Sequence, residues 1–184
     1  NVTYSGAGNK TFDYLFIDEQ GSFSFTPTSA KSLTITNDIE LGGDLTLGTV
    51  DDFSATNFDI ENGATFDITE ADALSVTNFN VKTGGTATIT SATSLSTTDL
   101  DVDGTLSLTT TEDVTVSDLD MSGDFSIAGS STSDVTLTNA DVESGATLTI
   151  SNANDIASTD TAIKGNLIIG TANDLTFTDL DVDG

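Results

Sequence analysis

The sequence predicts an all-β fold, a single-stranded three-faced β-solenoid or parallel β-helix, expected to be right-handed and to have about nine coils of about 20 residues. An apolar anchor recurs about every 20 residues along the whole chain. Between anchors, apolar and polar residues alternate in short runs, which is typical of strands with one buried face. The anchors are Phe12, Leu33, Phe53, Leu74, Leu95, Val114, Val135, Ile156 and Leu175.

Each predicted coil contains three alternating runs, as residues 95–113 illustrate. Because strand side chains alternate between two faces, each run buries one set, and three runs can enclose a dry triangular core. The first run places pairs such as Leu74/Val76 inward, and the second places pairs such as Phe79/Val81 inward. The third run supplies Val2/Tyr4, Phe23/Phe25, Leu45/Leu47, Ala87/Ile89, Leu106/Leu108, Phe125/Ile127, Leu148/Ile150 and Leu167/Ile169.

The predicted corners carry residue types that accept turn geometry. An Asn or Asp closes the first run at Asn37, Asn57, Asn78, Asp99, Asp118, Asn139, Asp160 and Asp179, and stacked Asn side chains can hydrogen-bond along such a column. A glycine precedes the third run at Gly43, Gly63, Gly85, Gly104, Gly123, Gly145 and Gly165. Pro27 lies in a longer polar corner, Thr26 to Ser32, where it removes no ladder hydrogen bond.

The composition excludes several classes of function. The chain holds 4 Lys+Arg against 30 Asp+Glu, and its net charge of −26 repels nucleic acids and anionic membranes. It has neither cysteine nor histidine, which removes disulfides and the commonest general base. Its acidic residues are regularly spaced rather than clustered, so we predict no enzyme activity and no required cofactor. No apolar run reaches the roughly 20 residues that cross a bilayer, so no membrane insertion by this segment is expected.

Residues 1–184 are predicted to form a single solenoid segment, uncapped at both ends. The chain begins in a third run, with Val2 and Tyr4 inward, and stops after a second run, with Leu180 and Val182 inward before Gly184. The expected partner is therefore the chain itself, either as covalent continuation of a longer solenoid or as head-to-tail stacking of subunits. A boundary that happens to fall between strands is the third alternative.

Two sets of acidic residues are predicted to stack into columns. One follows the outward positions of the second run, at Asp59, Asn80, Asp101, Asp120, Asp141 and Asp181. The other precedes the first run, at Asp52, Asp72, Asp113, Asp134, Asp155 and Asp174. Like charges on neighbouring strands repel, and Ca²⁺ would relieve the repulsion through carboxylate oxygens. The candidate calcium ligands are Asp99, Asp101, Asp103, Asp120, Asp141 and Asp181, and a solvated face screened by salt is the alternative.

The outward side chains of the first run form a candidate binding face. Its threonines are Thr34, Thr36, Thr56, Thr77, Thr98, Thr115, Thr136, Thr138, Thr176 and Thr178. Flat Thr-x-Thr arrays resemble the ice-binding faces of some antifreeze solenoids, and carbohydrate is the other ligand considered. Serine and Ala157 interrupt the array, and threonine is also a favoured, soluble strand residue. Asn1 and Asn9 begin matches to the N-glycosylation sequon.

The coil rhythm of residues 43–47, Gly-Asp-Leu-Thr-Leu, followed by a run ending in Thr56 and Asn57, resembles the repeats of filamentous-haemagglutinin-type adhesins and related bacterial surface β-helix repeat proteins. The resemblance covers nearly the whole chain, and it implies a long secreted β-helix that displays binding regions away from the cell. Abundant Thr, Ser, Asp and Gly with few cations also favours an extracellular location. We therefore predict a structural rod segment of an extracellular surface fibre or adhesin. The alternative is a binding module that uses the acidic columns for calcium or the threonine face for ice or carbohydrate.

Overall fold

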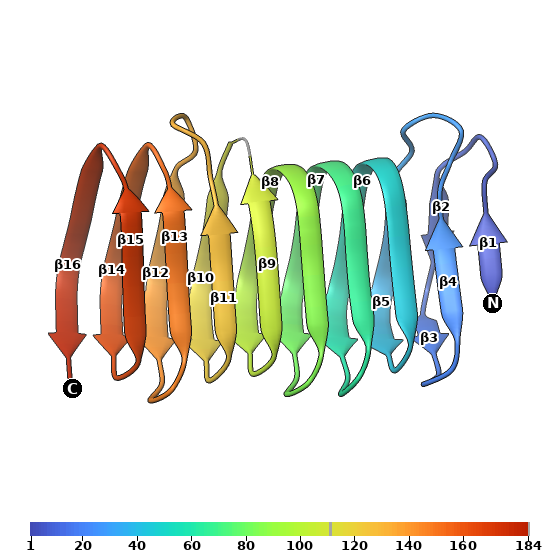
Figure 1. Ribbon diagram of the computed structural model, residues 1–184. Coiled ribbons are helices and arrows are strands. Elements are labelled where there is room, and N and C mark those ends of the chain that lie inside the picture. Colours follow the sequence, from blue (N-terminus) through green and yellow to red (C-terminus); the bar gives the residue numbers. More distant parts are fainter. Residues whose placement is uncertain (111, 184) are drawn as a thin grey trace.

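The computed structural model describes residues 1–110 and 112–183, which form a parallel β-solenoid of about nine coils of about 21 residues. Figure 1 shows the coils side by side in chain order, with the near strands rising and the far strands descending. The chain thus crosses the top from near to far while it advances toward the C-terminus, which is a right-handed winding. With about 4.8 Å between neighbouring coils, nine coils give a rod about 43 Å long. The predicted β-helix repeat architecture is confirmed.

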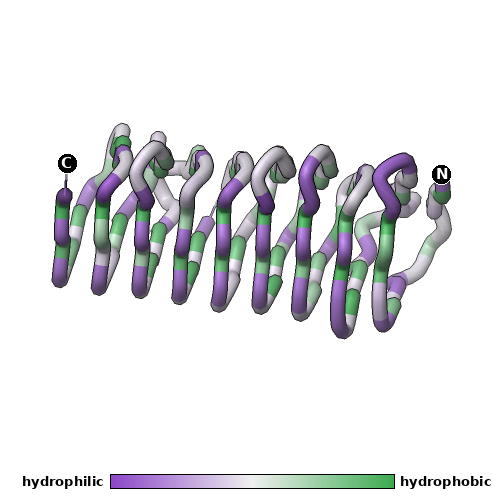
Figure 2. Tube along the Cα trace, turned by 90° about the horizontal axis from the view of Figure 1, so that it is seen from below, coloured by the Kyte–Doolittle hydropathy of each residue, from purple (hydrophilic) through white to green (hydrophobic). Residues whose placement is uncertain are grey.

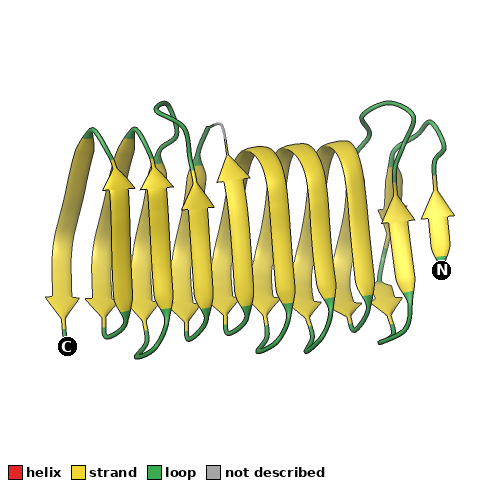
Figure 3. Ribbon diagram, viewed as in Figure 1, coloured by secondary structure: helices red, strands yellow, loops and turns green. Residues whose placement is uncertain are grey.

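The strands fall into three groups (Figure 3). Third runs form β1 (Val2–Tyr4), β4 (Ser22–Phe25), β9 (Thr105–Thr110), β11 (Asp124–Ala128), β13 (Thr147–Asn152) and β15 (Asn166–Thr171). First and second runs form β2 (Lys10–Phe12), β3 (Leu15–Ile17), β5 (Leu33–Leu41), β10 (Val114–Met121), β12 (Val135–Val142), β14 (Asp155–Ile163) and β16 (Asp174–Val182). In the middle coils all three runs merge into β6 (Asp44–Ile60), β7 (Thr65–Val81) and β8 (Thr86–Val102). Within the described residues there is no helix that could span a membrane.

From β5 onward the first corner of each coil is a bend inside a strand, not the strand end that the sequence predicts; in the first coil β2 ends before the corner and β3 begins after it. In β10, buried Val116 and Leu119 flank Ser117 and Asp118, which are both exposed. Two successive outward side chains shift the alternation by one residue and turn the strand onto the next face. Pairing continues through the bend, because Asp118 lies in register with Asp99 of β8 and Asn139 of β12.

The anchors from Leu33 to Leu175 stack in one column, in the register predicted from their spacing. The prediction of Phe12 as the first anchor is wrong, because Phe12 pairs with Ile35 and Lys10 lies opposite Leu33. A second difference arises at a register shift between Ile35 and Asp38 in β5. The extra residue of this bulge places Asp38, rather than Asn37, in the column with Asn57.

Inward side chains fill the interior of the rod, and polar and apolar residues alternate along each coil (Figure 2). Phe53, Phe58, Phe66 and Phe79 form a fully buried aromatic cluster, in which the rings of Phe58 and Phe66 lie 4.8 Å apart in an edge arrangement. Such contacts between coils add to the free energy gained from apolar burial. The third-run pairs from Phe23/Phe25 to Leu148/Ile150 are buried as predicted.

A glycine column runs along the second corner, but Gly63 and Gly145 lie outside it. In their coils Ala64 and Ala146 precede the strand, and Gly63 and Gly145 take the third position of a four-residue turn, as Gly84 does before Gly85. Ala64 N donates to Glu61 O, and Ala146 N donates to Glu143 O, at 3.0 Å each. Gly63 has a φ of 81° and Gly145 a φ of 96°, values that favour glycine at the third position of such a turn.

Candidate functional site

Two columns of outward polar side chains run side by side along the descending strands. We call the first the acid column; it contains Phe16, Glu40, Asp59, Asn80, Asp101, Asp120, Asp141, Ala162 and Asp181. We call the second the corner column; it contains Asp38, Asn57, Asn78, Asp99, Asp118, Asn139, Asp160 and Asp179. The acid column matches the predicted second-run set from Asp59 to Asp141, but Phe16 and Glu40 extend it and Ala162 separates Asp181 from the rest.

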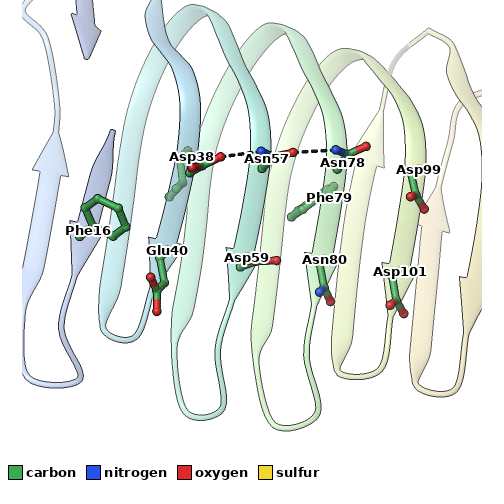
Figure 4. A pocket seen from close by; sticks show the side chains of 11 residues that line it. Phe16, Asp38, Glu40, Asn57, Asp59, Asn78, Phe79, Asn80, Asp99 and Asp101 are labelled. Atoms are coloured by element: carbon green, nitrogen blue, oxygen red, sulfur yellow. Dashed lines mark hydrogen bonds between the residues drawn. The ribbon is translucent and has the colours of Figure 1, made fainter. Parts of the chain in front are cut away.

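Amide side chains hydrogen-bond along the corner column, as the stacked Asn residues predict. Asn57 Nδ2 donates to Asp38 Oδ1, and Asn78 Nδ2 donates to Asn57 Oδ1 at 2.6 Å. Figure 4 shows this chain of hydrogen bonds crossing three coils. Because Asn57 donates to the previous coil and accepts from the next, the chain fixes both the register and the direction of these side chains.

A groove of about 450 Å³ lies over these columns on β5, β6, β7 and β8. Figure 4 shows the corner column along one side, the acid column along the other, and Phe16 at the N-terminal end. The lining residues are Phe16, Asp38, Ile39, Glu40, Asn57, Asp59, Asn78, Phe79, Asn80, Asp99 and Asp101. The side-chain oxygen Oδ1 of Asn80 is buried and accepts no hydrogen bond from the described part of the chain. The groove is therefore rich in acceptors and poor in free donors.

An exposed aromatic pair marks the N-terminal end of the groove. The rings of Tyr14 and Phe16 stack at 6.1 Å between centroids and 11° between planes, with 52% and 61% of each residue exposed. Phe16 lies opposite Glu40 in the register of β3 and β5. The sequence did not predict this pair, because the spacing of the anchors gave the wrong register for the first coil.

Carboxylates in the acid column disfavour one another's charge. Partial burial raises the pKa of Asp101, and the charges of Asp103, Asp120 and Asp99 raise it further. Partial burial likewise raises the pKa of Asp120, and among the neighbouring charges Asp141 raises it most. The carboxylates of the acid column therefore repel one another at neutral pH, and this repulsion lowers the stability of the folded state.

We expect this repulsion to appear as a pH dependence of stability. A carboxyl group whose pKa is higher in the folded than in the unfolded state favours folding when protonated, so its penalty is present above the folded pKa and is lost below the unfolded pKa. The melting temperature should therefore rise as the pH falls from 7 toward 4. At pH 7, Asp120→Asn should raise the melting temperature by about 1–2 °C and flatten that rise.

Thermal unfolding followed by circular dichroism at several pH values measures both effects. Asp44→Asn is the matched control, because it removes the same charge from an exposed position outside the column. An equal gain from the control would assign the effect to net charge alone, and the column would then have no special role.

The predicted calcium ligands lie in several columns rather than in one cluster. Asp99 belongs to the corner column, Asp101, Asp120, Asp141 and Asp181 belong to the acid column, and Asp103 begins the next corner. No group of three or more acidic side chains close enough to hold a metal ion occurs among residues 1–110 and 112–183. Calcium binding stays a prediction, and it would require side chains of several coils to converge.

The second predicted acidic set is interrupted, because Ala73 rather than Asp72 lies in register with Asp52. Asp72 lies two residues before its anchor Leu74, whereas Asp52 lies directly before its anchor Phe53. Further along, carboxylates accept hydrogen bonds from the next coil. Asn154 Nδ2 donates to Asp134 Oδ1 at 2.9 Å, and Asp155 N donates to the same oxygen at 3.3 Å. These donors offset part of the repulsion at this corner.

Two of the four lysines pair with acids of the preceding coil. Lys82 Nζ donates to Glu61 Oε1, and Lys164 Nζ lies 3.0 Å from Glu143 Oε1 and 3.6 Å from Asp141 Oδ1. The hydrogen bond to Glu61 raises the pKa of Lys82, and that to Glu143 raises the pKa of Lys164. Exposed pairs of this kind contribute little stability, but their repetition at the same corner helps to specify which coils stack.

The predicted threonine face is present as two outward columns on the first run. One column follows the strands and contains, in coil order, Thr34, Ser54, Ser75, Ser96, Thr115, Thr136, Ala157 and Thr176. The other predicted threonines, at 36, 56, 77, 98, 138 and 178, are exposed at the bend, as is Thr159, which the prediction omitted. Neighbouring coils are linked through this face, for Thr56 Oγ1 donates to Thr36 O at 2.8 Å.

No protein-family model, curated protein or solved structure matches this chain. Its fold and candidate sites therefore rest on its own geometry.

The predicted end residues are less buried than their internal counterparts. Val2, Leu180 and Val182 are 60%, 44% and 64% exposed, and Tyr4 is half-buried against Phe25. These positions lack a described coil on one side, whereas equivalent residues inside the rod have a coil on both. Gly184, the last residue of the predicted end-to-end contact, lies outside the described residues. That contact stays a prediction.

Proposed function

We propose that this segment is a structural rod of an extracellular surface fibre or adhesin, whose role is mechanical reach and regular display. The observation that carries the proposal is the parallel pairing of each described coil with the next, from Leu33 to Val182. In such a fold each coil contacts only its two neighbours, so the length of the rod increases in proportion to the number of coils.

Stability without disulfides supports the same role. Each coil is too thin to bury its own apolar face, and it folds only against its neighbours. The buried aromatic cluster and the corner column both join successive coils, so the rod resists bending through side chains as well as backbone. The repeated interface is one that a further coil can extend, in the same chain or in a second copy of it.

The composition favours an extracellular location, because Thr, Ser, Asp and Gly are abundant and Lys and Arg are few. A net charge of −26 keeps the rod soluble and repels copies that approach side by side. Side-by-side repulsion leaves end-to-end extension as the preferred growth direction.

A binding module is the second candidate, because the threonines at the bend are exposed and recur once in almost every coil. Such a face would present hydroxyl and methyl groups on a fixed lattice to ice or carbohydrate. Calcium in the acidic columns is the other form of this candidate.

Immunogold electron microscopy of intact producing cells tests the rod proposal, using an antibody raised against the purified segment. We expect label on fibres outside the cell envelope, and label confined to the cell interior would overturn the proposal. Replacing Thr36, Thr77 and Thr138 by lysine is the matched variant. If fibres persist and the cells keep their surface behaviour, the threonine face is not a binding site; if fibres persist and attachment is lost, the binding module is the better description.

A further inference from the structure

We propose that the groove beside Phe16 binds a linear polyamine, an extended organic cation whose ammonium groups are separated by short methylene chains. The proposal does not depend on the rod function, because it concerns one stretch of one face. Three features of the groove support it: its aromatic end, its excess of acceptors and the spacing of its carboxylates.

The aromatic pair offers a surface for an ammonium group. The rings of Phe16 and Tyr14 stack on each other, and more than half of each residue remains exposed. The face of an aromatic ring attracts a cation placed within about 6 Å of its centroid. Because Phe16 lies in register with Glu40, a cation on this ring also comes within reach of a carboxylate. Beyond the groove the acid column continues, but no aromatic residue joins it among the described residues.

The polar groups of the groove require a ligand that donates. Its five carboxylates accept hydrogen bonds only, and its lining contains no lysine. The amides of Asn57 and Asn78 already donate along the corner column, so they compete little with a donating ligand for the carboxylates. An ammonium group carries three N–H donors and no acceptor, so it complements this lining in both charge and hydrogen bonding.

The spacing of the carboxylates fits an extended cation better than a compact one. Successive coils place acid-column residues about 4.8 Å apart, so Asp59 and Asp101, with Asn80 between them, are separated by about 9.6 Å. A metal ion needs several oxygens at one point, and no cluster of three acids is present in the described chain. Ammonium groups joined by three or four methylenes have spacings comparable to one coil, so successive ammonium groups can follow the column.

Isothermal titration calorimetry of the 184-residue chain with spermidine, at about 150 mM NaCl to screen diffuse attraction, tests the proposal. We expect one saturable site. Phe16→Ala should weaken the affinity about tenfold, and Phe16→Leu should do the same while keeping apolar bulk. Asp59→Asn combined with Asp101→Asn should weaken it at least as much. These asparagines preserve the fold, because Asn80 already occupies this column.

The acid column supplies its own matched control. Asp120→Asn combined with Asp141→Asn makes the same charge change in the same column, beyond the groove. The proposal requires that this control keep its affinity within twofold. Equal weakening by the two double variants, or an unchanged affinity in both Phe16 variants, would mean that spermidine is only a diffuse counterion. Absence of saturable heat in the native chain would also overturn the proposal. Circular dichroism and thermal unfolding establish that each variant is folded.

Discussion

Leu106→Asp is expected to unfold the middle of the solenoid, with a loss of more than about 4 kcal/mol in the free energy of unfolding. Leu106 is fully buried in β9, in register with Ala87 of one neighbouring coil and Phe125 of the other. A carboxylate at this position would have no cation and no donor among the inward apolar side chains. Either it stays charged in the core or it takes up a proton, and both are costly.

Urea unfolding followed by far-ultraviolet circular dichroism measures this loss. Thr109→Asp adds the same charge at an exposed position of the same strand, and it should change the midpoint very little. Leu106→Ala should cost about 2–5 kcal/mol, which separates lost packing from buried charge. A native-like midpoint for Leu106→Asp would mean that the rod interior is not the dry core described above.

Gly123→Ala is expected to be the most damaging single-methyl change at the corners, costing about 3 kcal/mol. An added Cβ would lie 2.1 Å from Gly104 O and 2.6 Å from the carbonyl carbon of Asp103. Both atoms belong to the backbone of the previous coil, so no side-chain rotation relieves the overlap. The hydrogen bond from Gly123 N to Val102 O, at 2.8 Å, holds the two corners together. The variant must therefore separate two coils at this corner.

Differential scanning calorimetry should show Gly123→Ala melting about 6–12 °C below the parent chain. Ala64→Gly is the matched control, because Ala64 lies in the same column at a coil with a four-residue turn. It should cost only about 1 kcal/mol, the conformational-entropy difference between alanine and glycine. A loss from Gly123→Ala no larger than that of the control would show that the corner can relax.

The sequence was sufficient to predict the interior of the rod from Leu33 onward. Each inward position has a neighbour on both sides, so a shift of one residue would expose a whole run of apolar side chains, and the register is strongly specified. The hydrogen bond between Asn78 and Asn57 was predictable for the same reason, since correct stacking of the anchors also aligns the corners. The merging of three runs into one strand was not predictable, because a bend within a strand and a break between two strands contain the same types of polar residue.

The first coil shows where spacing fails as a guide. Phe12 was taken as an anchor, but the corner between Phe25 and Leu33 is two residues longer than the equivalent corner between Leu47 and Phe53, so the position equivalent to Leu33 is Lys10. Nothing in the alternation reveals such insertions, because loops of different length leave no periodic signal. The groove was missed with the first coil, since Phe16 can be placed beside Glu40 only when that register is known.

The strands lie across the rod, so their backbone hydrogen bonds run along its length. A tensile force on the two ends therefore acts directly on these bonds, and it opens one interface between coils at a time rather than shearing a whole sheet. Each coil that peels away adds about 65–70 Å of extended chain, many times the length that it occupied in the rod. A rod built in this way would therefore lengthen in steps under tension, one coil at a time.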